Sequence, residues 1–189
     1  MSRLFAGKTR CWRCLLLACL LNISFILCSF LAFAEAENEY AVKAAFIANF
    51  IVLTEWPDDG SSKALDVVTL CVVSDSPLPR PLQGLEGKQV GSKTIHVVTA
   101  TPDTTLPACQ VVFYMQDVDS ENLVRTLTAV RFAPVLTIGE NNNVTRLGGT
   151  MHFYEKQGRL RFVINLKAVT EQKLKMSSRL LQVATLIND

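Results

Sequence analysis

Short apolar runs rich in β-branched residues, separated by helical or loop segments, constrain the fold of this chain more than any other feature. The first run, Val67–Val73, is almost continuously apolar, as expected of a strand that is buried on both faces of a sheet. The pattern predicts four such strands, at residues 67–73, 94–99, 111–115 and 134–138. Strands that alternate with helices favour an α/β fold with a mainly parallel sheet.

The predicted helices lie between and around these strands. Asn38 is a good N-cap for an amphipathic helix over residues 39–54, which Trp56-Pro57 ends. Its side chains at three- and four-residue spacing share one face: Val42, Ala45, Phe46, Asn49 and Phe50. Further helices are expected around residues 82–85, over 120–131 with Ser120 as a candidate cap, and over 177–187 with Ser177 as a cap.

The C-terminal part of the chain predicts an antiparallel hairpin. Residues 151–154 and 159–166 alternate apolar and polar side chains, and Glu155-Lys-Gln-Gly158 joins them. Residues 141–143 and the paired glycines 148–149 are expected in a loop and a turn. We therefore expect a single α/β domain of Rossmann or flavodoxin-like type, with a mainly parallel sheet flanked by helices and antiparallel edge strands from the hairpin.

The first 34 residues have the features of a secretory signal peptide. An apolar stretch from Cys14 to Ala34 ends in Ala32-Phe33-Ala34, the small-x-small pattern that signal peptidase recognises. The preceding basic residues are Arg3, Lys8, Arg10 and Arg13. We expect cleavage before Glu35, which leaves a mature domain of residues 35–189; an uncleaved membrane anchor is the alternative.

Removal of this leader reverses the net charge. The whole chain has 19 basic and 17 acidic residues, and the leader carries four of the basic residues and none of the acidic ones. The mature chain therefore has a net charge of 15 − 17 = −2. It shows no evident basic patch, which argues against a nucleic-acid partner.

Only two cysteines, Cys71 and Cys109, follow the leader. An even number of cysteines in an oxidising compartment predicts one disulfide, and a redox-active pair is the alternative. If the first and third strands are neighbours, as in a flavodoxin-like order, these two cysteines come within bonding reach.

The sequence contains no recognisable catalytic or metal-binding constellation. His96 and His152 have no partners at metal-ligand spacing, and no Gly-x-Ser-x-Gly motif presents a nucleophile. Leu147-Gly148-Gly149 lacks the strand–loop–helix context of a phosphate loop. We therefore expect no catalytic residue, no metal and no cofactor, and a binding function instead of an enzymatic one.

Both ends of the mature chain carry motifs that resemble one bacterial family, the YfiR family of periplasmic repressors. The N-terminal match is Tyr40-x-Val42-Lys43-Ala44-Ala45-Phe46-x-x-Asn49-Phe50, followed by Trp56-Pro57. The C-terminal match is Gly148-Gly149, Arg161-Phe162-x-Ile164-Asn165-Leu166-x-Ala168 and Met176-Ser177-Ser178-x-Leu180-Leu181-x-x-Ala184. Some relatives have a second cysteine pair around the two glycines, whereas residues 140–154 here contain no cysteine.

This resemblance implies a non-enzymatic regulator in the periplasm. Members of the family resemble an adaptor that binds the periplasmic part of an inner-membrane diguanylate cyclase and holds it inactive, which keeps cyclic di-GMP low and restrains biofilm formation. In some systems an outer-membrane, OmpA-like lipoprotein captures the repressor and releases the cyclase. A homodimer is also compatible with the sequence.

Two surfaces are candidates for binding. For a protein partner, the predicted exposed set lies on the hairpin and after it: Phe153, Tyr154, Arg159, Arg161, Val169 and Lys173. Phe153 is as well suited to the core as to this surface. The alternative function is a small-molecule sensor, with a ligand at the carboxyl ends of the strands next to Ser74, Asp75 and Ser76.

Overall fold

The computed structural model describes residues 37–57, 66–101 and 109–188. The chain divides into two compact units, Met1–Glu39 and Tyr40–Asp189, and all strands named below belong to the second. The predicted signal peptide and its cleavage site lie outside the described residues. None of the described helices is long and apolar enough to cross a membrane.

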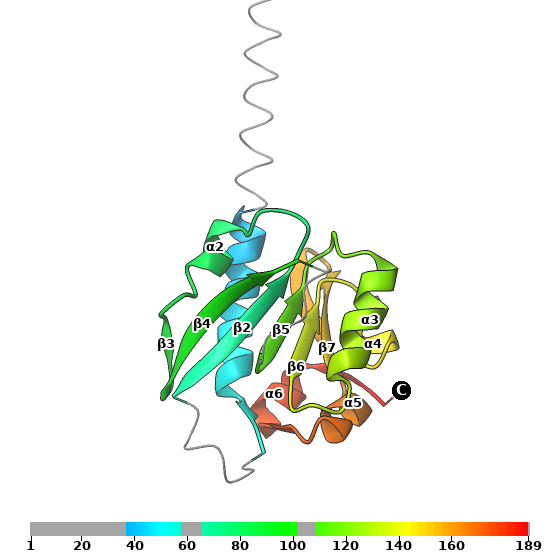
Figure 1. Ribbon diagram of the computed structural model, residues 1–189. Coiled ribbons are helices and arrows are strands. Elements are labelled where there is room, and N and C mark those ends of the chain that lie inside the picture. Colours follow the sequence, from blue (N-terminus) through cyan, green and yellow to red (C-terminus); the bar gives the residue numbers. More distant parts are fainter. Residues whose placement is uncertain (1–36, 58–65, 102–108, 189) are drawn as a thin grey trace, which may run out of the picture. The chain divides into compact units, whose positions relative to one another are not determined.

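The second unit is built on a sheet of eight strands in the order β10-β8-β7-β6-β5-β2-β4-β3 (Figure 1). The strands are β2 (Val67–Val73), β3 (Gln89–Val90), β4 (Lys93–Ala100), β5 (Val111–Tyr114), β6 (Leu136–Gly139), β7 (Met151–Lys156), β8 (Arg159–Asn165) and β10 (Thr185–Ile187). The strands from β4 across to β7 pair in parallel. Counted among themselves they have the 2-1-3-4-5 order of flavodoxin-like folds, which confirms the predicted fold class.

Helices cover both faces of this sheet, and the two faces bury separate cores. Val68 and Leu70 of β2 belong to the cluster that contains the N-terminal helix, which is described over residues 37–52. Cys71 and Val73 belong to the cluster under α3 (Ser120–Val130). Alternate residues of a strand point to opposite faces, so a single strand supplies both cores. Figure 1 shows the N-terminal helix behind the sheet and α3 in front of it.

The N-terminal helix differs from the prediction at its start and in its buried face. Residue 37 is already helical, so Asn38 lies inside the helix and is not its N-cap. Val42, Ala45 and Asn49 are exposed, because a neighbouring stripe with two isoleucines buries more apolar surface. That stripe consists of Lys43, Ala44, Ile47, Ala48, Phe50 and Ile51.

The remaining helices of the parallel region are short or capped one residue away from the expected position. Helix α2 spans Arg80–Gln83, and α3 is capped by Asp119 instead of Ser120, because the Asp119 carboxylate accepts hydrogen bonds from the backbone N–H groups of Glu121 and Asn122. Helix α4 (Asn143–Arg146) forms at the end of the segment expected to be a loop. Gly149 is required beside it, since a Cβ atom there would lie 2.5 Å from Cγ1 of Val144.

The hairpin is formed by β7 and β8 with a two-residue turn, in which Gln157 and Gly158 have φ values of 54° and 67°. The prediction that the hairpin forms the edge of the sheet is wrong, because β10 pairs in parallel with β8 and is itself the edge strand. The predicted helix over residues 177–187 is also wrong in its second half. Helix α6 (Ser178–Val183) ends at Val183, and the following residues form β10.

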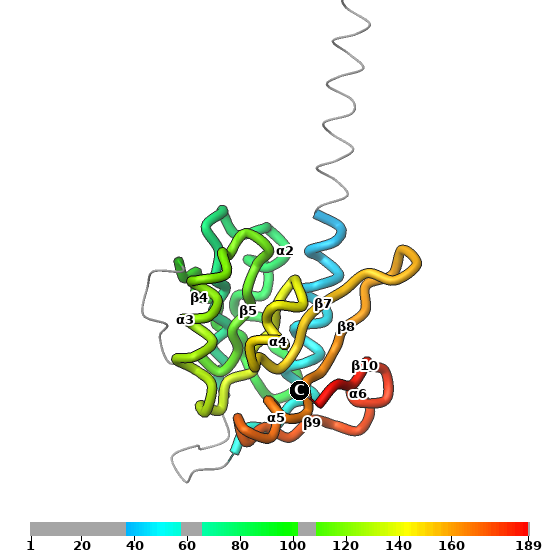
Figure 2. Tube along the Cα trace, turned by 90° about the vertical axis from the view of Figure 1, so that its right-hand side faces the viewer, coloured from blue at the N-terminus to red at the C-terminus, as the bar shows by residue number. Residues whose placement is uncertain are grey.

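A second, two-stranded sheet joins the two ends of the described unit. Strand β1 (Thr54–Glu55) pairs antiparallel with β9 (Lys175–Met176), and the backbone N–H of Ser177 donates to the carbonyl of Leu53 at 2.9 Å. Helix α5 (Leu166–Glu171) leads from β8 to β9. The end of the N-terminal helix and the start of α6 are therefore held side by side (Figure 2).

Candidate functional site

The inward face of the hairpin belongs to the aromatic core. Phe153 and Phe162 lie directly opposite each other in the register and are 2% and 4% exposed. Their rings pack against Phe50 of the N-terminal helix, with centroids 5.8 and 4.8 Å away. The prediction that Phe153 is an exposed contact is therefore wrong, because burial in an aromatic cluster stabilises the fold more than exposure would.

The outward face of the same hairpin carries basic side chains. In the register Tyr154 lies opposite Arg161, and Lys156 lies opposite Arg159, so all four share one face. We call these four residues the hairpin basic face. Lys156, Arg159 and Arg161 are exposed, and Tyr154 is half-buried with its hydroxyl 2.8 Å from Oγ1 of Thr185 in β10. The predicted residues Tyr154, Arg159 and Arg161 are thus brought together, and Lys156 is a neighbour that the sequence analysis missed.

This face contains an arrangement that costs stability. Like charges directly opposite each other on paired strands repel, and Lys156 and Arg159 occupy such a pair. Within the described part of the chain, no ion pair or hydrogen bond engages the side chains of Lys156, Arg159 or Arg161. Their positive charge is therefore available to a partner.

The other two residues of the predicted partner surface do not join this face. Val169 in α5 is 7% exposed and belongs to the core, so its predicted exposure is wrong. Lys173 is exposed, but it follows α5 in the chain. Figure 2 shows α5 at the end of β8 that is remote from the hairpin turn. Its positive φ of 56° marks the turn that leads into β9.

At the carboxyl edge of the sheet, Ser74 links the ends of β2 and β5. Ser74 is 3% exposed, and its hydroxyl donates to Oδ2 of Asp117 at 2.9 Å and accepts from the backbone N–H of Ser76 at the same distance. Burial raises the pKa of Asp117, but hydrogen bonds from Ser76 and Ser74 outweigh it, so the net shift is below the ordinary value. Asp75 and Ser76 are exposed. Of the predicted ligand-binding residues, Ser74 is therefore engaged within the protein.

The N-terminal helix contributes a buried ion pair to the same edge. Nζ of Lys43 lies 2.6 Å from Oε1 of Glu140, and the two side chains are 7% and 3% exposed. Oε2 of Glu140 accepts from the backbone N–H of Gln116 at 2.6 Å and from the Tyr40 hydroxyl at 3.4 Å. Tyr40 and Lys43 are both part of the N-terminal motif, and this network explains their presence there. Sequence analysis missed Glu140, because nothing in its local pattern indicates a buried partner 97 residues from Lys43.

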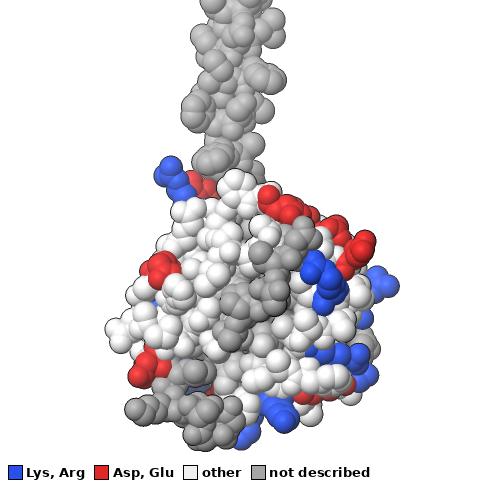
Figure 3. Space-filling view, in the orientation of Figure 1, with Lys and Arg blue, Asp and Glu red and all other residues white. Residues whose placement is uncertain are grey.

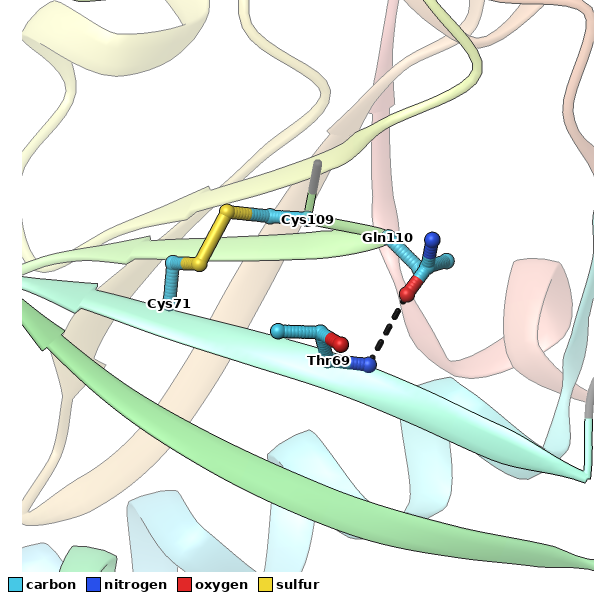
Figure 4. The surroundings of a disulfide bond; sticks show 4 residues. All are labelled: Thr69, Cys71, Cys109 and Gln110. Atoms are coloured by element: carbon cyan, nitrogen blue, oxygen red, sulfur yellow. Dashed lines mark hydrogen bonds between the residues drawn. A yellow bond between two sulfur atoms is a disulfide. The ribbon is translucent and has the colours of Figure 1, made fainter. Parts of the chain in front are cut away.

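The disulfide connects β2 with the segment just before β5 (Figure 4). Cys71 in β2 and Cys109 just before β5 are bonded, with Cα atoms 6.0 Å apart, and beside them the backbone N–H of Thr69 donates to Oε1 of Gln110 at 2.9 Å. Both cysteines are buried, which restricts access by a reductant. The bridge spans 38 residues and stabilises the fold by about 3–4 kcal/mol on the chain-entropy model.

The histidines have structural surroundings. His152 is 8% exposed with Nδ1 2.8 Å from Oγ1 of Thr145, and burial lowers its pKa. His96 is exposed, with Nδ1 3.2 Å from Oε1 of Glu86. Over residues 37–57, 66–101 and 109–188, no group of three His, Cys, Asp or Glu side chains could hold a metal ion.

Comparison with known proteins places this architecture in a family. Residues 40–185 match the YfiR/HmsC-like family, so the chain belongs to that family. Its members are regulatory proteins of the periplasm, not enzymes. No curated protein shows significant similarity to the chain.

Among solved structures, the chain is similar to the ABC domain of Streptococcus pneumonia in complex with L-Trp, at 12% identity and a TM-score of 0.46. The match covers 64% of this chain and 55% of that one, so the chain spans about half the length of the solved protein it matches.

Proposed function

We propose that this protein is exported by a cleavable signal peptide and binds the periplasmic domain of an inner-membrane diguanylate cyclase, holding it inactive. The match of residues 40–185 to the YfiR/HmsC-like family carries this proposal. The result is a lower level of cyclic di-GMP and restrained biofilm formation. A buried disulfide is in keeping with an oxidising compartment.

The hairpin basic face is the proposed contact surface. It combines Tyr154 with two arginines, and Tyr and Arg are the residue types enriched at energetic hot spots. Its charges repel one another in the free protein, so an acidic patch on the partner would relieve this repulsion on binding. Since the mature chain is mildly acidic overall, this local positive charge also orients the encounter.

Repression follows from a difference in affinity. A regulator inhibits only if it binds the inactive form of the cyclase more tightly than the active form. Moving the cyclase from almost fully active to almost fully inactive requires a preference of about 5.5 kcal/mol. An outer-membrane, OmpA-like lipoprotein that binds the same face would compete with the cyclase and release it.

The experiment is crosslinking in whole cells, followed by purification of this protein and mass spectrometry of its partners. Recovery of a membrane cyclase with a periplasmic domain supports the function, and its absence from cells that express it would overturn it. Arg159→Glu with Arg161→Glu should then abolish recovery, whereas Lys88→Glu, an exposed cation next to β3 at the far edge of the sheet, should not. Equal recovery with the double variant would show that the contact lies elsewhere.

Ligand sensing at Ser74, Asp75 and Ser76 stays a prediction. Any ligand there must compete with Asp117 for the Ser74 hydroxyl. A ligand would therefore have to offer at least an equivalent hydrogen bond.

A further inference from the structure

A cavity of about 230 Å³ lies at the edge of the sheet opposite Ser74, where α3, α4 and α5 converge. In Figure 1 these three helices lie together at the lower right, and Figure 3 shows basic side chains in that region with acidic ones beside them. The residues that line the cavity are Arg131, Thr145, Arg146, Leu147, Gly148, Lys167, Ala168 and Glu171.

The charged side chains around this cavity are mainly cationic. Glu171 is the only carboxylate among the described residues that line it, and Oε2 of Glu171 lies 3.5 Å from Nε of Arg131. For Arg146 and Lys167 there is no ion pair or side-chain hydrogen bond to any described residue. Pairing of Arg131 with Glu171 therefore leaves two cations without a counter-charge at one small cavity.

Buried hydrogen bonds fix the walls that carry these two cations. Asn165 is fully buried; its Nδ2 donates to the carbonyl of Thr145 at 3.3 Å, and its Oδ1 accepts from the backbone N–H of Lys167 at 3.1 Å. Oγ1 of Thr145 is in turn hydrogen-bonded to Nδ1 of His152. The backbones of Arg146 and Lys167 are thus held next to each other before any ligand arrives, which reduces the entropic cost of binding.

We propose that this cavity binds a small molecule with an oxyanion group, either a phosphate or a carboxylate. Guanidinium and ammonium groups form strong charge-assisted hydrogen bonds with both. The cavity is smaller than the roughly 300–1,000 Å³ of sites for drug-sized ligands, so the ligand is a compact anion. Such a site is separate from the hairpin basic face and goes beyond the proposed repression of a cyclase.

The test is isothermal titration of the exported protein with sodium phosphate and with sodium succinate, against sodium chloride at matched ionic strength. We expect saturable binding of at least one of the two oxyanions at one site. Arg146→Gln and Lys167→Gln should each weaken it about tenfold or more, as expected for a charge-assisted hydrogen bond. Lys88→Gln, at an exposed cation next to β3 and away from both the cavity and the hairpin basic face, should leave it unchanged.

Binding of phosphate alone or of succinate alone identifies the group that the cavity accepts. The proposal is overturned if neither binds, if chloride gives the same heat, or if both cavity variants bind as tightly as the original protein. Arg146 and Lys167 are exposed, so the variants should fold, and circular dichroism with thermal unfolding checks this before titration.

Discussion

The two faces of the β7–β8 hairpin have the same backbone and register but opposite roles. On the inward face Phe153 and Phe162 pack against the N-terminal helix. On the outward face Lys156 and Arg159 oppose each other without a counter-charge among the described residues. Alternation along a strand thus separates stability from binding, since neighbouring residues of one strand serve different purposes.

The largest effect should come from the inward face. Phe153→Ala removes most of a buried aromatic side chain and leaves a cavity among Phe46, Phe50 and Phe113, which should lower the free energy of unfolding by about 3–5 kcal/mol. Chemical denaturation measures this loss. Lys156→Ala is the matched control and should change stability by less than about 0.5 kcal/mol. An unchanged free energy of unfolding for Phe153→Ala would place that side chain on the surface. It would contradict the claim that the inward face of the hairpin stabilises the fold more than the outward face.

A buried charge offers the next comparison, because Lys43 and Lys156 differ mainly in their surroundings. Lys43→Met leaves the Glu140 carboxylate buried without its counter-charge and should cost about 3 kcal/mol. Hydrogen bonds from Gln116 and Tyr40 to Glu140 remain and limit the loss. Lys156→Met is the control and should be close to neutral in thermal and urea unfolding. Similar values for both lysines would show that the Lys43–Glu140 pair contributes no more than an exposed charge.

These contrasts also mark what the sequence could predict. The strands of the parallel region were predictable, because apolar runs such as Val67–Val73 carry a strong local signal. A flavodoxin-like order was expected to bring the two cysteines within bonding reach, and the neighbouring positions of β2 and β5 do so, with Cα atoms 6.0 Å apart. For these elements the local pattern and the tertiary structure agree.

The errors occur where tertiary contacts decide. Phe153 was as compatible with the surface as with the core, and only the position of Phe50 settles the question. The C-terminal residues 185–187 have a pattern compatible with a helix, but the free edge of β8 offers them hydrogen-bond partners, and they form β10. Likewise, Glu140 is identified as a buried ion-pair partner only once the fold brings it to Lys43.

A smaller effect, in the opposite direction, is expected on the outward face. Lys156→Glu replaces a like-charge pair opposite Arg159 with an opposite-charge pair, so the free energy of unfolding should rise by about 0.2–1 kcal/mol. The same change should weaken capture of the cyclase, because it reduces the positive charge that we propose the partner recognises. Urea denaturation and quantitative crosslinking measure the two quantities on one variant. A gain in both stability and capture would contradict a role for the hairpin basic face in binding.

The smallest expected effect is on the pH dependence of stability and comes from Asp117. This exposed carboxylate is hydrogen-bonded, unlike the cations on the outward face of the hairpin. Because hydrogen bonds from Ser76 and Ser74 hold the pKa of Asp117 below its ordinary value of 3.8, the folded state binds this proton more weakly than the unfolded state. Asp117 therefore contributes stability above pH 3.8, and this contribution is lost as the pH falls through its lower folded-state pKa. Asp117→Asn should flatten the acid limb of the stability–pH curve slightly, as thermal unfolding at successive pH values would show. Asp75→Asn, a neighbouring exposed carboxylate, is the control. If both variants changed the acid limb equally, the effect would reflect general surface charge and not the bonds between Ser74 and Asp117.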